Sequence, residues 1–306
     1  MAGPLMLLDT ASLYFRAFFG VPESVRAPDG SPVNAVRGLL DMLARLVTAR
    51  RPGRLVACWD DDWRPAFRVA AIPSYKAHRV APDGGEDVPE ALVGQIPVIV
   101  EALAALGVPR VGLPGFEADD VIGALAVREA ACPAATRVPV EVVTGDRDLF
   151  QLVDDATDVR VLYTARGLGD LQVVDQAWLA ARYGVPTGAA YADLAVLRGD
   201  PSDGLPGVAG IGEKTAAALL ARHGDLAGVL AAHRAGEIGG AQGRRLSDAA
   251  EYLAVAPDVV RVANPPVPEV DDLLPPQPDP ERLMALAERW GLSSSVARAL
   301  DALSQG

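Results

Sequence analysis

The 306-residue chain has few of the residues that build disulfide frameworks, zinc sites or membrane spans. It contains only two cysteines and three histidines, and Cys58 and Cys132 lie far apart in apolar runs. These numbers exclude a disulfide scaffold and a zinc knuckle, and they favour a reducing cytoplasm. The first apolar run ends at Asp9, which is too early for a membrane-spanning helix or a secretory signal. We therefore expect a cytoplasmic protein with no membrane contact.

Lysine is nearly absent as well. Lys76 and Lys214 are the only lysines among 28 basic residues, a bias that is typical of a GC-rich genome. A lysine kept against that bias is a candidate for a task that arginine performs poorly, such as approaching a phosphate as a compact point charge. The 40 acidic residues give a net charge of −12, which by itself argues against a nucleic-acid partner.

The first 190 residues alternate strand and helix patterns. Helical periodicity covers residues 33–49 and 89–106, and another helix begins near residue 117. Short apolar runs predict strands at residues 4–8, 54–59, 109–113, 138–144, 159–163 and 171–174. This alternation predicts an α/β fold, a mostly parallel sheet with helices on both faces.

The remainder of the chain has a different character. From about residue 189 to 256, short helices and glycine turns predict a small all-α subdomain. A proline-rich stretch, 265–280, and two amphipathic segments follow it. We expect residues 257–306 to pack back on the first domain, 1–188.

A long connection, residues 61–88, follows the second predicted strand. Connections of this length are usually either disordered or functional. Between residues 63 and 80 it carries cations and aromatic residues but no acid, namely Trp63, Arg64, Phe67, Arg68, Tyr75, Lys76 and Arg79. A solvated charged loop is one interpretation. Cations without counter-charges in an acidic chain favour contact with an anion instead.

Carboxylates stand where predicted strands end and where the next helices begin. The residues are Asp9, Asp60, Glu117, Asp119, Asp120, Asp146 and Asp148. The carboxyl ends of parallel strands face the ligand crevice of an open sheet, so we expect these side chains to meet. Each group alone could instead cap a helix or complement its dipole.

A cluster of so many carboxylates has a chemical consequence. The groups repel one another and raise one another's pKa unless cations lie among them. Oxygen ligands suit the hard divalent ions Mg²⁺ and Mn²⁺, whereas zinc would need histidine or cysteine. Paired ions about 4 Å apart catalyse phosphodiester hydrolysis. The pattern therefore predicts metal-dependent hydrolysis of a phosphodiester.

A glycine-rich turn, residues 207–212, opens a helix and follows two more acids, Asp200 and Asp203. Alone, these acids belong to an ordinary turn sequence. The glycine turn resembles a helix–hairpin–helix, whose backbone N–H groups, with Lys214 and Thr215 in the next helical turn, face a phosphate. A dinucleotide-binding fingerprint is excluded because no strand precedes the glycines. A purely structural turn remains the alternative.

Three motifs, at residues 115–120, 144–149 and 199–215, resemble those of the 5′-nuclease (flap endonuclease) family. The chain is similar in particular to the bacterial 5′–3′ exonuclease that is also found as the N-terminal domain of DNA polymerase I. With 306 residues it resembles the free-standing form. The resemblance implies a PIN-like domain over 1–188, a helical arch at about 61–88, and a helix–three-turn–helix over 189–256.

The resemblance also implies roles for individual residues. Two or three Mg²⁺ or Mn²⁺ ions would be bound by two clusters, which are Asp9, Asp60, Glu117, Asp119 and Asp120, and Asp146, Asp148, Asp200 and Asp203. The reacting phosphate would be contacted by Lys76, Arg79 and Arg16. DNA would be bound by Arg64, Arg68, Tyr75, Gly207, Gly210, Gly212, Lys214 and Thr215. A potassium ion would bind the backbone carbonyls of Val208 and Ile211.

The function that this resemblance implies is a structure-specific 5′ nuclease acting on DNA with 5′ flaps, nicks or duplex ends, in replication and repair. Its nine site carboxylates account for most of the net charge, so the acidity does not oppose DNA binding. We also expect a nucleoid-associated monomer with a replicative or repair polymerase as partner. Three alternatives stay open: a non-catalytic DNA-structure-binding paralogue, a PIN-type ribonuclease, and a small-molecule phosphatase.

Overall fold

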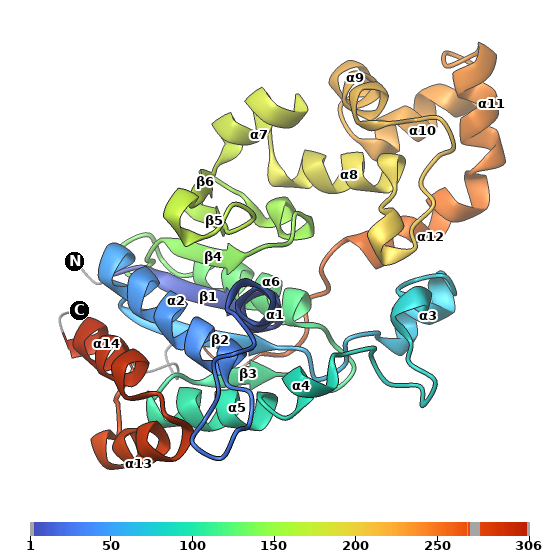
Figure 1. Ribbon diagram of the computed structural model, residues 1–306. Coiled ribbons are helices and arrows are strands. Elements are labelled where there is room, and N and C mark those ends of the chain that lie inside the picture. The colour runs from blue at the N-terminus through green and yellow to red at the C-terminus, as the bar shows by residue number, and fades with distance from the viewer. Residues whose placement is uncertain (1–2, 268, 270–275, 305–306) are drawn as a thin grey trace.

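A single sheet of six strands forms the centre of the computed structural model, which describes residues 3–267, 269 and 276–304 (Figure 1). The spatial order is β3-β2-β1-β4-β5-β6, and the strands are β1 (Leu5–Asp9), β2 (Arg54–Trp59), β3 (Arg110–Gly112), β4 (Val140–Thr144), β5 (Val159–Tyr163) and β6 (Gln172–Val174). Neighbours pair in parallel except β5 and β6, which are antiparallel. The predicted mostly parallel sheet is confirmed. Part of the predicted proline-rich stretch, 265–280, lies outside the described residues.

Successive residues of the central strands face opposite apolar cores. In β1, Leu7 belongs to one core and Met6 to the other, and both are fully buried. Leu7 lies in register with Val56 of β2 and Val142 of β4. Because both faces of the sheet are covered, these strands are continuous apolar runs rather than alternating ones.

Helices cover both faces of the sheet. One face packs against α1 (Thr10–Gly20), α2 (Asn34–Arg50), α4 (Glu90–Val93), α5 (Ile96–Ala105), α13 (Pro280–Trp290) and α14 (Ser293–Ser304). The other packs against α6 (Ala118–Ala130), α7 (Gln176–Tyr183), α8 (Gly188–Arg198) and the 3-10 helix η2 (Asp148–Leu152). In Figure 1, α14 lies along α2, far from the helices α9–α12.

The single helix expected over 89–106 is wrong, because the chain forms α4 and α5 with a break between them. Pro97 lies in the first turn of α5. Its ring would clash with the carbonyl four residues earlier in a continuous helix, which is that of Val93, the last residue of α4. The buried Gln95 at the break accepts a hydrogen bond from the N–H of Ala35 at 2.8 Å and so caps the start of α2.

A group of helices beside the sheet follows α8 (Figure 1). It comprises α9 (Glu213–His223), α10 (Leu226–Arg234), α11 (Gly240–Asp248) and α12 (Ala250–Val260). The remaining short elements are α3 (Ala66–Ala71) and the 3-10 helices η1 (Ala77–Arg79), η3 (Leu168–Asp170) and η4 (Pro201–Asp203). Across the part of the chain that the structure describes, no helix is long and apolar enough to cross a membrane.

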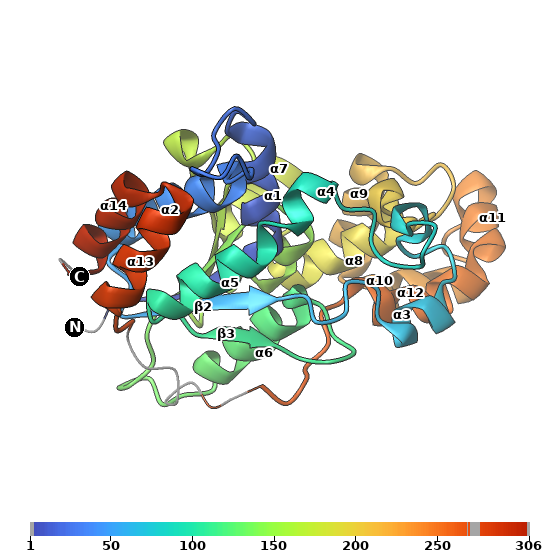
Figure 2. The same cartoon turned by 60° about the horizontal axis from the view of Figure 1, so that its bottom comes forward.

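The connection over 61–88 is folded against the helical group. Its helix α3 lies beside α12 in both orientations (Figures 1 and 2). The N–H of Lys76 donates to the carbonyl of Asp203 at 2.9 Å, and the hydroxyl of Ser74 donates to the carbonyl of Gly204 at 2.8 Å. These contacts hold the connection against the turn that contains η4.

Candidate active site

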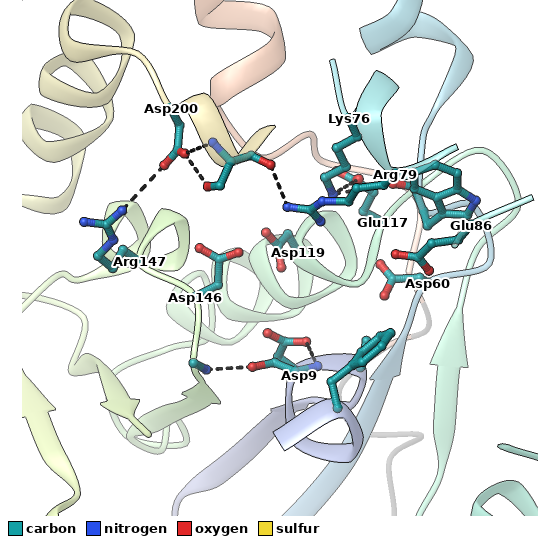
Figure 3. Close-up of a pocket in the computed structure, with 16 residues that line it drawn as sticks. Asp9, Asp60, Lys76, Arg79, Glu86, Glu117, Asp119, Asp146, Arg147 and Asp200 are labelled. Carbon is teal, nitrogen blue, oxygen red and sulfur yellow. Dashed lines mark hydrogen bonds and ion pairs between the residues drawn. The ribbon is translucent and has the colours of Figure 1, made fainter. Parts of the chain in front are cut away.

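A cavity of about 360 Å³ opens where β1, β2 and β4 end (Figure 3). It is lined by Asp9, Asp60, Glu86, Glu117, Asp119, Asp146, Asp200, Lys76, Arg79 and Arg147, together with Ala11, Ser12, Phe15, Trp63, Gly145 and Ser202. Most of its carboxylates come from the groups that the sequence places after strands and at helix starts. The structure therefore brings these distant segments together at one edge of the sheet.

Asp9 ends β1 and caps α1. One of its oxygens accepts from the N–H of Ser12 at 3.1 Å, and the other accepts from the hydroxyl of Thr144 at 2.6 Å. Burial is the main reason that the pKa of Asp9 rises to about 7. The hydrogen bond from Thr144 lowers this pKa, and the charge of Asp60 raises it.

Asp60 follows β2 and contacts the start of α6. Its carboxylate accepts from the N–H of Ala118 at 2.8 Å, one of the free N–H groups of that helix end. Burial raises the pKa of Asp60 despite this hydrogen bond. Burial also raises the pKa of Asp119, in the first turn of α6, well above its ordinary value, and the charges of Asp9 and Asp146 add to the effect.

Asp146 and Asp148 follow β4 in a tight turn. The N–H of Asp148 donates to the Asp146 carboxylate at 2.9 Å. Burial, followed by the charge of Asp146, raises the pKa of Asp148 well above its ordinary value. Asp148 and Asp203 line a smaller cavity of about 20 Å³ beside the first, and Glu117 and Asp119 line both.

Asp200 caps the start of the 3-10 helix η4 and Asp203 is its last residue, and both are buried. Their partners are cations. Arg147 lies 3.7 Å from the Asp200 carboxylate, and Arg79 donates to the Asp203 carboxylate at 2.7 Å. The turn thus places both acids at the edge of the carboxylate cluster rather than leaving them on the surface.

Three predicted phosphate-binding cations take different positions. Lys76 forms an ion pair with Glu117, whose charge holds the lysine pKa well above its ordinary value although burial lowers it. Arg79 reaches the cavity from η1. Arg16 lies on α1 near Gly145, and its buried Nε has no hydrogen-bond partner in the described part of the chain.

Two predicted DNA contacts and one predicted metal ligand are corrected by the structure. Arg68 is 2% exposed and Tyr75 is 4% exposed, so neither can reach DNA. Asp120 is fully buried, and both its oxygens are occupied, by the Arg68 guanidinium and by the N–H of Ala263. Each Asp120 oxygen accepts two hydrogen bonds, because the N–H of Glu117 donates as well, and Asp120 does not line the cavity.

The glycine turn lies before α9, away from the cavity. Gly207 and Gly210 have φ of +63° and +74°, and Gly212 caps α9 with an extended backbone. Lys214 is exposed and Thr215 is half-buried in the first turn of α9. The carbonyl of Gly210 accepts from the Arg245 guanidinium at 3.0 Å. Helix N–H groups beside exposed cations form a surface that suits phosphate.

Arg64, a predicted DNA contact, and Val208, a predicted potassium ligand, form hydrogen bonds within the protein. Arg64 donates to the carbonyls of Tyr75 at 2.6 Å and Pro73 at 3.0 Å, which stabilises its own segment. Val208 and Ile211 are buried, and the carbonyl of Val208 accepts from the N–H of Ile211 at 2.9 Å.

Sequence reasoning missed Glu86 and Arg147 as lining residues. Arg147 stands between two predicted ligands, Asp146 and Asp148, so its position in the motif could have revealed it. Glu86 reaches the cavity because an isolated bridge pairs it with Val80, and no sequence pattern predicts that bridge.

The donor set fits a hard divalent cation, because oxygen ligands from several carboxylates surround one cavity and burial raises the pKa of most of them. As the side chains stand, residues 3–267, 269 and 276–304 contain no group of three Asp, Glu, His or Cys close enough together to hold an ion. Mg²⁺ usually keeps several water ligands and takes only one or two carboxylates from the protein, so the cavity carboxylates suit this ion.

Comparisons with known proteins agree with this arrangement. A family model described as 5′-3′ exonuclease, N-terminal resolvase-like domain, matches residues 4–184. A second, described as 5′-3′ exonuclease, C-terminal SAM fold, matches residues 186–281. The fold is thus a resolvase-like α/β domain joined to a helical SAM-fold domain. The chain belongs to the 5′-3′ exonuclease family.

Its relatives include free-standing and polymerase-linked proteins. The chain is 60% identical to a 5′-3′ exonuclease of Streptomyces coelicolor over 98% of this chain and 100% of the relative. It is 54% identical to a 5′-3′ exonuclease of Mycobacterium tuberculosis over 99% of this chain and 98% of the relative. The DNA polymerase I of M. tuberculosis is 44% identical over 72% of this chain and 23% of its own length.

Solved structures of bacteriophage T5 proteins share the fold. The T5 5′-exonuclease with bound zinc aligns with a TM-score of 0.63 at 19% identity, covering 98% of this chain and 99% of its own. The T5 D15 flap endonuclease, solved with DNA and metal ions, aligns with a TM-score of 0.64 at 17% identity, covering 99% of this chain and 100% of its own.

Proposed function

We propose that this chain is a divalent-metal-dependent, structure-specific 5′ nuclease that hydrolyses DNA phosphodiesters at 5′ flaps, nicks and duplex ends. The observation that carries the proposal is the cavity, in which carboxylates from separate segments meet and the cations Lys76 and Arg79 lie at the rim. Two relatives that match along almost the full length of both chains are named 5′-3′ exonucleases.

The cavity carboxylates would hold the cations. Asp9, Asp60, Glu117 and Asp119 would form one cluster, and Asp146, Asp148, Asp200 and Asp203 would form the second. Mg²⁺ or Mn²⁺ bound there supplies charge neutralisation and a lowered pKa for the attacking water. The T5 5′-exonuclease binds a divalent ion on the same fold.

Three basic side chains, Lys76, Arg79 and Arg16, would orient the scissile phosphate. Lys76 is half-buried, so its ammonium interacts in a medium of lower dielectric than water and stabilises developing negative charge more strongly than an exposed cation would. Arg79, at the end of η1, lines the same cavity and offers a planar fork of donors. Arg16 is half-buried on α1 with its guanidinium near Gly145, and would contact a further phosphate oxygen through that guanidinium.

The helical group would bind duplex DNA through contacts with the phosphates of the DNA backbone. The turn over 207–212 and the start of α9, with Lys214, would contact phosphates without reading bases. We also propose a monovalent cation, potassium, at the carbonyls of Val208 and Ile211, beside Arg245. In the cell we propose a cytoplasmic, nucleoid-associated monomer that acts in replication and repair with a polymerase partner.

A cleavage assay on a 5′-flap duplex tests the proposal. The double variant Asp146→Asn with Asp148→Asn should lose cleavage in Mg²⁺, whereas Asp170→Asn, an exposed acid outside the site, should cleave like the wild type. Wild-type cleavage by the double variant would refute the proposal. An all-RNA flap and a simple phosphate monoester belong in the same assay, because preferential hydrolysis of either would assign a different substrate class.

A further inference from the structure

Arg68 lies at a junction of three parts of the chain. It belongs to α3, its Nε donates to the carbonyl of Val259 at the end of α12 at 3.0 Å, and its guanidinium contacts the start of α6. The side chain is almost completely buried. A buried charge that is shared by three elements can be stable only where each of its donors finds a partner.

The contacts to α6 are specific to the guanidinium shape. Both Nη atoms donate to the Asp120 carboxylate, at 2.8 and 2.6 Å, and Nη1 also donates to Glu117 at 2.7 Å. A planar fork makes such paired hydrogen bonds, whereas the single ammonium of lysine cannot. Asp120 is therefore the main acidic partner of Arg68, and Glu117 is the second acid that Arg68 contacts.

Glu117 is the residue through which this network meets the cavity. Its carboxylate also accepts from the hydroxyl of Tyr75 at 2.8 Å and forms the ion pair with Lys76. Glu117 lines both cavities, whereas Arg68 and Tyr75 line only the smaller cavity beside the first. Any shift of Arg68 would thus move the cavity carboxylate and the lysine paired with it.

The same junction joins the helical group to the cavity. After α12, the N–H of Ala263 donates to Asp120 at 2.7 Å. The carbonyl of Val260 accepts from Gln151 of η2 at 3.1 Å, and the N–H of Val262 donates to the Gln151 side chain at 2.9 Å. In Figure 1 the chain that leaves α12 runs back past α6.

We propose that Arg68 is a positioning residue: it fixes Glu117, and with it Lys76, in the active site, and it joins the end of α12 to that site. The proposal rests on the proposed nuclease function. Arg68 does not touch DNA. It instead keeps the DNA-binding helices and the reacting groups in one fixed relation, which a strictly oriented hydrolysis requires.

The decisive variant is Arg68→Lys, which keeps the positive charge but cannot form the forked contacts. A matched control is Arg54→Lys. Arg54 pairs at 2.8 Å with Glu129, a buried acid at the opposite end of the same helix α6. Both variants weaken a buried ion pair on α6, but only the first lies next to the cavity.

For each variant, the rate of single-turnover cleavage of a 5′-flap duplex in Mg²⁺ and the affinity for the same DNA in EDTA should be measured at a temperature at which both variants are folded. A thermal scan without DNA should give the rise in Tm that Mn²⁺ causes. Arg68→Lys should cleave at least about tenfold more slowly, with DNA affinity changed less than about threefold. Its Mn²⁺-induced rise in Tm should be smaller than that of Arg54→Lys, which should keep wild-type cleavage.

Equal cleavage rates for Arg68→Lys and Arg54→Lys, or equal losses of rate and DNA affinity in Arg68→Lys, would overturn the proposal. If the wild type itself does not cleave flap DNA, the proposed function fails first, so the two failures are distinct. Should Arg68→Lys not fold, Tyr75→Phe removes a single donor to Glu117 without a change of charge. This variant should slow cleavage by a few-fold at unchanged DNA affinity, and wild-type cleavage would count against the proposal.

Discussion

Lys76 connects the two carboxylate clusters, because its ammonium pairs with Glu117 while its backbone N–H donates to the carbonyl of Asp203. Its backbone has φ of +47°, a left-handed conformation that costs a non-glycine residue about 1–3 kcal/mol. Such a conformation persists only where the surrounding contacts determine it. Lys76 is therefore held in place before any phosphate arrives.

This position predicts that Lys76→Ala reduces the chemical step far more than DNA binding. Loss of one charged group that faces a developing negative charge lowers rates by about 10²–10³-fold. Single-turnover cleavage of a 5′-flap duplex should show a loss of this size, while affinity measured in EDTA changes little. Parallel losses in rate and affinity would instead make Lys76 a docking residue.

Lys214, the other lysine of the chain, is the matched control. It is exposed in the first turn of α9, beside the glycine turn and away from the cavity. Lys214→Ala should weaken DNA binding and reduce its salt dependence, because one phosphate contact is lost. Its cleavage rate at saturating protein should stay near that of the wild type.

The raised pKa of Asp9 predicts how the metal-free protein responds to pH. The folded chain holds the proton up to about pH 7, whereas an ordinary aspartate loses it near 3.8. The stability that this proton contributes is complete below pH 3.8 and is lost as the pH rises through 7. In EDTA the Tm should therefore fall between about pH 4 and 7, by about 2 °C for each 1 kcal/mol lost, and level off above that range.

Two comparisons assign this pH effect to the site. Asp9→Asn, which cannot ionise, should flatten the decline, and Mg²⁺ should raise the wild-type Tm more at pH 8 than at pH 6. An Asp9→Asn protein whose Tm falls as steeply as that of the wild type would show that other groups dominate.

The sequence predicts the sheet and the edge at which the acids gather, because both depend on local patterns. Buried strands are continuous apolar runs, and Asp9 ends one of them while Asp60 and Asp146 follow two others. The environment of Arg68 was not predictable in this way. Its partner Val259 is 191 residues away, so nothing near Arg68 in the sequence indicates that it is buried.

Asp120 illustrates the same limit. Its spacing of three from Glu117 places both on one helix face, and the sequence cannot show which of them meets the cavity. In the structure Asp120 accepts from the N–H of Glu117 at 3.1 Å in a capping box and pairs with Arg68, whereas Glu117 lines the cavity. Arg68, which belongs to α3, pairs with Asp120 and so keeps that acid away from the cavity that Glu117 lines.

Two glycines of the turn before α9 should have different roles, Gly207 in stability and Gly212 in DNA binding. A Cβ on Gly207 would lie 2.4 Å from the carbonyl oxygen of Arg198, and its φ is +63°. Gly207→Ala should therefore destabilise the protein by about 1–3 kcal/mol in denaturant unfolding. A Cβ on Gly212 meets nothing within 4 Å, so Gly212→Ala should fold normally and lose DNA affinity instead. Equal Tm values for the two variants would contradict this distinction.

Arg245 should weaken the dependence of DNA binding on potassium. Its guanidinium donates to the carbonyl of Gly210, in the same turn as Val208 and Ile211, where we propose the monovalent cation. A fixed positive charge at this turn repels a bound cation and partly takes its place.

In the wild type, exchanging K⁺ for Li⁺ at constant ionic strength should therefore change DNA affinity only slightly. Arg245→Gln keeps a hydrogen-bond donor but removes the charge, so the same exchange should cost it several-fold more affinity. An identical K⁺ response in both proteins would show that the guanidinium does not influence the cation site.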